Sequence, residues 1–150
     1  MTASSADRPS GPRLYLDTSA YLCVLLGEQG AGAIASLTRG AVLVSSVLLV
    51  LEARRNIVRL ARMGALKSAD YKACLDRLDE DQKRFVLRDL TLDLCQSNVL
   101  PAVTTPRSLD LAHLRTALWF QSEAPLDGFV TMDTAQAEAA RELGLATGPE

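Results

Sequence analysis

The sequence has few of the features that mark secreted and membrane proteins. Its three cysteines, Cys23, Cys74 and Cys95, are odd in number and far apart, so they form neither a CxxC pair nor the disulfide framework of a small secreted domain. A largely apolar run, residues 41–51, stops near ten residues and meets Glu52, which indicates buried core rather than a membrane span. We therefore expect a soluble, cytoplasmic protein with reduced thiols and no membrane contact.

A strong charge of one sign is also missing. The formal net charge of −2 gives no overall attraction to a polyanion, so any nucleic-acid contact must come from a local patch. The Ser/Pro/Gly-rich residues 1–12 contain no apolar run long enough for a signal peptide, and we expect a disordered leader there. The 150 residues, 48% of them hydrophobic, suffice for one sizeable core, so residues 13–150 are predicted to form a single domain.

Apolar segments of strand length alternate with segments of helical periodicity. Strands are predicted at residues 14–16, 42–44 and 128–131, and helices at residues 20–26, 31–38, 47–63, 108–122 and from about 134 to 144. A further helix, which Ser68 can cap, is predicted to form a helical arm with the helix at 47–63. Residues 85–87 and 99–101 are short and ambiguous. The strand–helix–strand order predicts an α/β fold, a three-layer α/β/α sandwich around a central parallel sheet.

Four carboxylates are expected at one edge of this sheet. Asp17 follows the first strand and Asp133 follows the strand at 128–131, and ligand sites of open parallel sheets lie outside the carboxyl ends of strands. Glu52 and Asp110 lie early in two helices that begin near the same edge. Each acid alone can be a helix cap or a solvated residue. Glu52, however, interrupts a predicted buried segment, where an ionised side chain needs a partner or a metal.

Clustered carboxylates repel one another. Two charges 4 Å apart in an effective dielectric near 20 repel by about 4 kcal/mol, which raises some of the pKa values unless a cation is present. An all-oxygen site suits Mg²⁺ or Mn²⁺, and such an ion can activate water and stabilise charge that develops on a phosphodiester. The acids therefore predict metal-assisted phosphodiester hydrolysis.

Three stretches resemble the PIN-domain ribonucleases, especially the small toxins of the VapC type. They are LDTSA at residues 16–20, DLAHLRTA at residues 110–117, and FVTMD at residues 129–133 leading into AARELGL at residues 139–145. Together with Glu52 in the intervening helix, they follow the family's order over about residues 13–148. The combination is more specific than any single stretch.

The resemblance implies a PIN-like fold and an endoribonuclease whose Mg²⁺ or Mn²⁺ is held by Asp17, Glu52, Asp110 and Asp133. It also implies that Thr131, and Thr18 or Ser19, hydrogen-bond within the site or to substrate, although helix capping explains Thr18 and Ser19 equally well. A homodimer and a small cognate antitoxin that covers the active-site groove are further implications of the resemblance.

Other classes of protein fit the sequence less well. A haloacid-dehalogenase-like phosphatase needs a second acid two residues after Asp17, where Ser19 stands. A receiver-type phosphoacceptor domain needs paired acids near the start and a later lysine, whereas all three lysines fall in the middle of the chain. Two alternatives stay open: a catalytically silent PIN-fold module for dimerisation or antitoxin binding, and a DNA nuclease that uses the same site.

A few further residues invite a functional interpretation. His113, the only histidine, is three positions after Asp110; we favour a packing or hydrogen-bonding role over that of a general base. Asp127 is predicted to be a turn residue rather than a fifth ligand. Trp119 and Phe120 are expected to pack in the core or at a dimer interface rather than to stack on a base.

Arginines follow Glu52 along its helix, at Arg55, Arg59 and Arg62. Contacts with RNA phosphates and ordinary ion pairing on a solvated helix surface explain them equally well.

Overall fold

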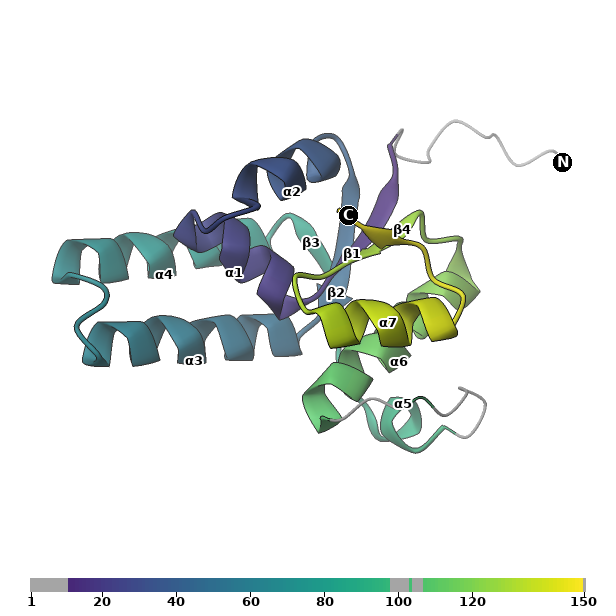
Figure 1. Ribbon diagram of the computed structural model, residues 1–150. Helices are drawn as coiled ribbons and strands as arrows, with labels where there is room; N and C mark the ends of the chain where they lie inside the picture. Colours follow the sequence, from purple (N-terminus) through teal and green to yellow (C-terminus); the bar gives the residue numbers. More distant parts are fainter. Residues whose placement is uncertain (1–10, 98–102, 104–106, 150) are drawn as a thin grey trace, which may run out of the picture.

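The computed structural model describes residues 11–97, 103 and 107–149. Within them, five strands form one sheet in the order β3-β2-β1-β4-β5, with every neighbouring pair parallel (Figure 1). The strands are β1 (Arg13–Leu16), β2 (Val42–Ser46), β3 (Phe85–Arg88), β4 (Gly128–Val130) and β5 (Thr147–Gly148). The helices are α1 (Thr18–Leu26), α2 (Ala31–Thr38), α3 (Leu48–Arg62), α4 (Ser68–Gln82), α5 (Leu92–Gln96), α6 (Ser108–Glu123) and α7 (Thr134–Glu142). The predicted α/β class with a central parallel sheet is confirmed.

Successive side chains of a strand point to opposite faces of the sheet, so a strand that is buried on both faces contributes to two separate clusters. Leu14 and Leu16 of β1 pack with Ala20 and Ile34 of α1 and α2. Tyr15, between them, packs on the other face in a cluster formed with α6 and α7. This arrangement is compatible with a three-layer α/β/α sandwich.

Helices α3 and α4 form a hairpin that extends from one side of the sheet (Figure 1). Leu49, Ala53 and Ile57 of α3 are fully buried against Leu78 of α4 and the side chains of α1. The inner side of the predicted helical arm is therefore packed into the hydrophobic core. Its outer side carries the arginines of α3.

The order of the strands places a topological switch point next to β1. From β1 the chain proceeds to β2 and β3 on one side, and later to β4 and β5 on the other. The connections that follow β1 and β4 therefore run in opposite directions along the sheet. Such a reversal opens a crevice at the carboxyl ends of these two strands. The Asp17 N–H donates to the Val130 carbonyl, 3.1 Å away, which joins the two strand ends.

Several element boundaries differ from the prediction. Helix α1 begins at Thr18 rather than residue 20, because Asp17 itself is the N-cap. Ser68 was expected to cap α4 but is its first residue; Lys67 occupies the cap position, without a side-chain hydrogen bond. The ambiguous residues 85–87 belong to β3. Helix α5 and strand β5 were not predicted, since both are too short to show a periodicity. Residues 99–101, and residues 1–10 of the expected leader, lie outside the described residues.

In the described part of the chain, no single helix is long and apolar enough to cross a membrane. Helices α1 and α2, which are bent by 112° relative to each other, reach the length and apolar composition of a membrane span only when the two are taken together.

Candidate functional site

An open pocket of about 260 Å³ lies at the crevice beside the carboxyl ends of β1 and β4. All four predicted acids line it. Its lining residues are Asp17, Thr18, Ser19, Leu22, Glu52, Asn56, Asp110, His113 and Asp133. Carboxylates from four separate segments of the sequence therefore face one shared space.

Asp17 is the most rigidly held of the acids. It is 5% exposed, and its Oδ1 accepts hydrogen bonds from the Ser19 hydroxyl (2.7 Å) and the Ala20 N–H (3.1 Å). The Thr131 hydroxyl donates to Oδ2. Burial raises the pKa of the Asp17 carboxyl, although the bonds from Thr131 and Ser19 act in the opposite direction. Two of the three hydroxyls predicted to support the site, those of Ser19 and Thr131, thus contact Asp17 directly.

The same hydroxyls attach the loop after β4 to Asp17. Ser19 Oγ accepts from the Met132 N–H at 2.9 Å, and Thr131 Oγ1 accepts from the Asp133 N–H at 3.1 Å. Asp133 then caps α7, accepting from the Gln136 N–H at 3.1 Å. Capping is hence part of how Asp17 and Asp133 are positioned, since each acid is the N-cap of the helix that follows its strand.

Glu52 lies in the second turn of α3, where its side chain is 23% exposed. Its Oε1 accepts from the Thr18 hydroxyl at 2.8 Å and lies 2.8 Å from Nε2 of His113. Burial alone would raise the pKa of Glu52, but His113, Thr18 and nearby Arg55 together lower it. Glu52 is therefore ionised at neutral pH, and the sequence-based expectation of a partly buried acid that needs a partner is confirmed.

Asp110, in the first turn of α6, experiences the charges of the other acids. Burial raises the pKa of its carboxyl, and the charges of Asp133 and Glu52 raise it further, while Arg107 and His113 oppose the shift. Among the described residues, no side chain or backbone N–H donates a hydrogen bond to this carboxylate. The pocket is thus a place where negative charges meet with incomplete compensation.

The donor set fits a hard divalent cation by its chemistry, because it consists of carboxylate and hydroxyl oxygens. In the part of the chain that the structure describes, however, no three Asp, Glu, His or Cys side chains are close enough to hold one ion together. The acids surround the pocket rather than converge on a point. A cation that keeps several of its waters and takes one or two carboxylates, as Mg²⁺ commonly does, is compatible with this spacing.

Three residues near the acids were not predicted from the sequence to belong to the site. Asn56 lines the pocket one turn after Glu52, a position that helical spacing could have indicated. The buried Gln136 donates from Nε2 to the Asp110 carbonyl at 2.8 Å and so joins α7 to the start of α6. Tyr15 lies behind the pocket and contacts His113. In the sequence, Tyr15 is one more apolar residue of a buried strand.

The structure also locates the remaining candidates. Arg55, Arg59 and Arg62 are exposed on α3. Asp127 accepts from the Arg13 N–H at 2.7 Å and does not line the pocket, which agrees with the predicted turn role. Phe120 is buried in the core, and Trp119 packs against the same cluster, as expected.

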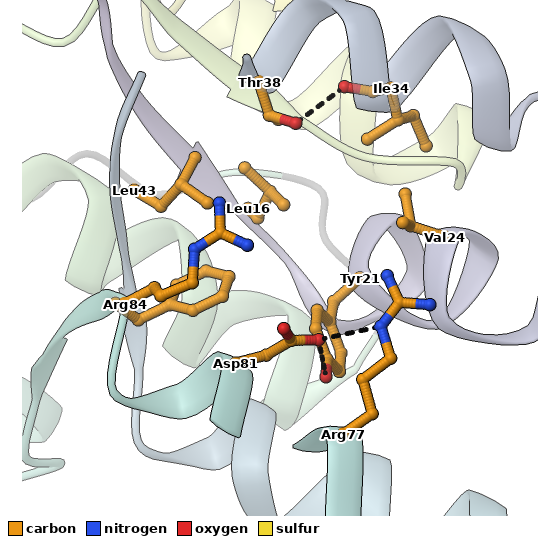
Figure 2. A pocket seen from close by; sticks show the side chains of 10 residues that line it. Leu16, Tyr21, Val24, Ile34, Thr38, Leu43, Arg77, Asp81 and Arg84 are labelled. Carbon is orange, nitrogen blue, oxygen red and sulfur yellow. Dashed lines mark hydrogen bonds and ion pairs between the residues drawn. The ribbon is translucent and has the colours of Figure 1, made fainter. Parts of the chain in front are cut away.

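A second pocket, of about 70 Å³, lies over the α1/α2 face of the sheet and contains none of the four acids. Its floor is apolar, and Asp81 at its rim is held by the Tyr21 hydroxyl (2.8 Å) and by Arg77 (3.4 Å), as Figure 2 shows. Asp81 therefore has hydrogen-bonding partners within the protein, whereas the described residues donate no hydrogen bond to the carboxylate of Asp110.

Comparison of the chain with models of known protein families gives no match, and comparison with curated proteins gives none either.

Proposed function

We propose that this protein is a metal-dependent nuclease that hydrolyses RNA phosphodiester bonds, with a PIN-like fold and with Asp17, Glu52, Asp110 and Asp133 as its metal-binding and catalytic residues. The observation that carries the proposal is that these four acids, far apart in the sequence, line one open pocket at the switch point of a parallel sheet. Ligand sites of open α/β sheets lie at this position.

The charge balance of the pocket supports a cationic cofactor. When bound, Mg²⁺ or Mn²⁺ supplies positive charge that lowers the pKa of water and offsets the charge developing on a phosphodiester. Asp17 is pre-oriented for binding a cation by Ser19 and Thr131. Asp110, whose pKa is raised by burial and by its acidic neighbours, would lose that unfavourable interaction on binding a cation.

The surroundings of the pocket suit a polymer better than an enclosed metabolite. The pocket is open, and α3 leads from Glu52 past Asn56 towards Arg59, whose guanidinium donates to Asn56 Oδ1 at 3.3 Å. Arg55 and Arg62 are exposed on the same helix. These arginines bind phosphates of the strand along α3 and position it without reading its sequence.

The biological setting is proposed from the resemblance to the VapC-type toxins alone. It comprises a cytoplasmic homodimer that acts as the toxin of a toxin–antitoxin pair, with a small antitoxin protein as partner.

The test is cleavage of a mixed set of structured and single-stranded RNAs, and of matching DNAs, in Mg²⁺, Mn²⁺ or EDTA. Asp17→Asn is the active-site variant, and Asp70→Asn, an exposed acid in the first turn of α4, is the matched control. We expect metal-dependent RNA cleavage by the wild-type protein and the control, and none by Asp17→Asn. Cleavage of DNA alone would make the protein a DNA nuclease. Folded, partner-free protein that cuts neither polymer would favour the silent binding module.

A further inference from the structure

Behind the pocket, Glu52 is connected to the interior of the sheet by a chain of hydrogen bonds. His113 is 2% exposed; its Nε2 lies 2.8 Å from Glu52 Oε1, and its Nδ1 lies 2.7 Å from the Tyr15 hydroxyl. Thr18 Oγ1 lies 3.2 Å from the same Nε2. Tyr15 is fully buried. Both ring nitrogens of the only histidine thus have a partner, one facing the site and one facing the core.

The protonation states of the partners determine the direction of these bonds. An ionised Glu52 can only accept hydrogen bonds, so Nε2 of His113 carries a proton and donates a hydrogen bond to Glu52. In the neutral imidazole, Nδ1 then accepts from the Tyr15 hydroxyl, which is fully buried and lies 2.7 Å away. The order of donation is therefore from Tyr15 to His113 to Glu52.

Aromatic packing fixes the origin of this chain. The Tyr15 ring stacks on Phe129 with centroids 5.2 Å apart and planes 6° apart, and it meets the His113 ring edge-on at 5.8 Å. Tyr15 and Phe129 belong to the core cluster formed with α6, and His113, a residue of α6, is itself 2% exposed. The Tyr15 oxygen and the imidazole consequently have little freedom to move.

We propose that Tyr15 and His113 are positioning residues that hold Glu52 by Oε1 and leave its Oε2 directed to the ligand of the pocket. No described residue hydrogen-bonds to Oε2. This inference deepens the proposed function and rests on it for the identity of the ligand, but the hydrogen-bond chain itself does not depend on it.

The physical reason is the flexibility of a glutamate side chain. Glu52 reaches the pocket from a helix through three rotatable bonds, and ordering such a side chain costs entropy each time it binds. A donor fixed in the core removes that cost before the ligand arrives. Outer hydrogen-bond partners of this kind typically change metal affinity or activity about 10-fold to 100-fold when they are removed.

The first test uses the single histidine as a probe in the metal-free protein. In tag-free protein labelled with ¹⁵N-histidine, we expect Nε2 of His113 to be protonated and its resonance to move in Glu52→Gln and in Tyr15→Phe. A ring whose Nε2 carries no proton, or a resonance that responds to neither variant, would overturn the proposal. This readout is independent of cleavage.

The second test compares two chemically identical changes. Tyr15→Phe removes the hydroxyl at the origin of the chain, and Tyr21→Phe removes another buried tyrosine hydroxyl, the one that donates to Asp81 in the second pocket (Figure 2). Affinity for Mn²⁺ is measured by calorimetry without RNA, and kcat and KM are measured with RNA. We expect Tyr15→Phe to weaken Mn²⁺ binding and lower kcat about 10-fold with little change in KM, and Tyr21→Phe to change neither.

Variants of His113 test the middle of the hydrogen-bond chain. His113→Leu is expected to cause at least the loss seen in Tyr15→Phe, and His113→Gln, which retains an N–H donor of similar reach, is expected to recover part of it. Equal effects of Tyr15→Phe and Tyr21→Phe would mean that the hydroxyl acts only through stability, and would overturn the inference. Wild-type protein that neither binds Mn²⁺ nor cleaves RNA would instead refute the proposed function, and the ¹⁵N measurement would still decide whether Glu52 is held in this way.

Discussion

Replacing Asp17 separates the structural role of this residue from its chemical role. Asp17 accepts three hydrogen bonds, from the Ala20 N–H and from the Ser19 and Thr131 hydroxyls. In Asp17→Asn, the amide oxygen can still cap α1, and a hydroxyl can rotate to accept from the new NH₂ group. Asp17→Ala has neither possibility.

The expected stabilities follow from these bonds. Asp17→Ala loses an N-cap, which costs about 1 kcal/mol. Ser19 Oγ and Thr131 Oγ1 lie 3.2 Å apart and can bond to each other, so only one hydroxyl loses its acceptor, at a cost of about 1 kcal/mol. We therefore expect Asp17→Ala to lower the free energy of unfolding by about 2 kcal/mol, and Asp17→Asn by less than about 1 kcal/mol, because Asn retains the cap and a partner for each hydroxyl.

Urea unfolding at pH 7, followed by circular dichroism, measures the two values, and RNA cleavage is measured on the same preparations. Both variants are expected to be inactive, although only Asp17→Ala is clearly destabilised. An Asn variant as unstable as the Ala variant would refute the reasoning, since it would show that the carboxylate itself supports the fold.

Three further predictions concern pH, phosphate binding and the helical arm. Because the pKa of Asp110 is raised on folding, its contribution to stability is present below about pH 4 and is lost as the pH rises through the folded value; Asp110→Asn should therefore gain stability relative to wild type between about pH 4 and pH 7 in urea unfolding, and a pH-independent difference would contradict this. Arg55→Gln is expected to raise the KM for RNA several-fold and to weaken its salt dependence, whereas the control Arg54→Gln, whose side chain pairs with Asp79, should leave both unchanged. Ile57→Ala is expected to lower the free energy of unfolding by about 3 kcal/mol, because Ile57 is fully buried where α3 packs against α1 and α4. A loss under about 1 kcal/mol in thermal or urea unfolding would mean that the arm is loosely packed.

The sequence was sufficient to predict the main elements and the gathering of the acids. Asp17 and Asp133 each follow an apolar strand, and parallel strands bring their carboxyl ends to one edge whatever lies between them in the chain. Glu52 was recognisable because a charge interrupts an apolar helix. Helix α2 was predicted with its observed bounds, since Gly30 and Gly40 frame its apolar residues.

The contacts behind the site were not predictable, because they depend on packing between distant segments. Tyr15 and His113 are 98 positions apart, and nothing in a strand sequence distinguishes a hydrogen-bonded tyrosine from an ordinary core residue. Gln136 reaches the Asp110 carbonyl only after α6 and α7 have packed on the same face of the sheet. The two-residue strand β5 forms through pairing with β4 rather than through its own periodicity.

The most direct test of the central claim is to locate a metal in the folded protein. Crystals of the protein alone, soaked in Mn²⁺, would be measured for anomalous scattering, with crystals of Asp17→Asn treated alongside. We predict an anomalous peak in the pocket lined by Asp17, Glu52, Asp110 and Asp133, and its loss or marked weakening in the variant. Well-diffracting crystals with no peak in this pocket, or with a peak that Asp17→Asn leaves unchanged, would contradict the account.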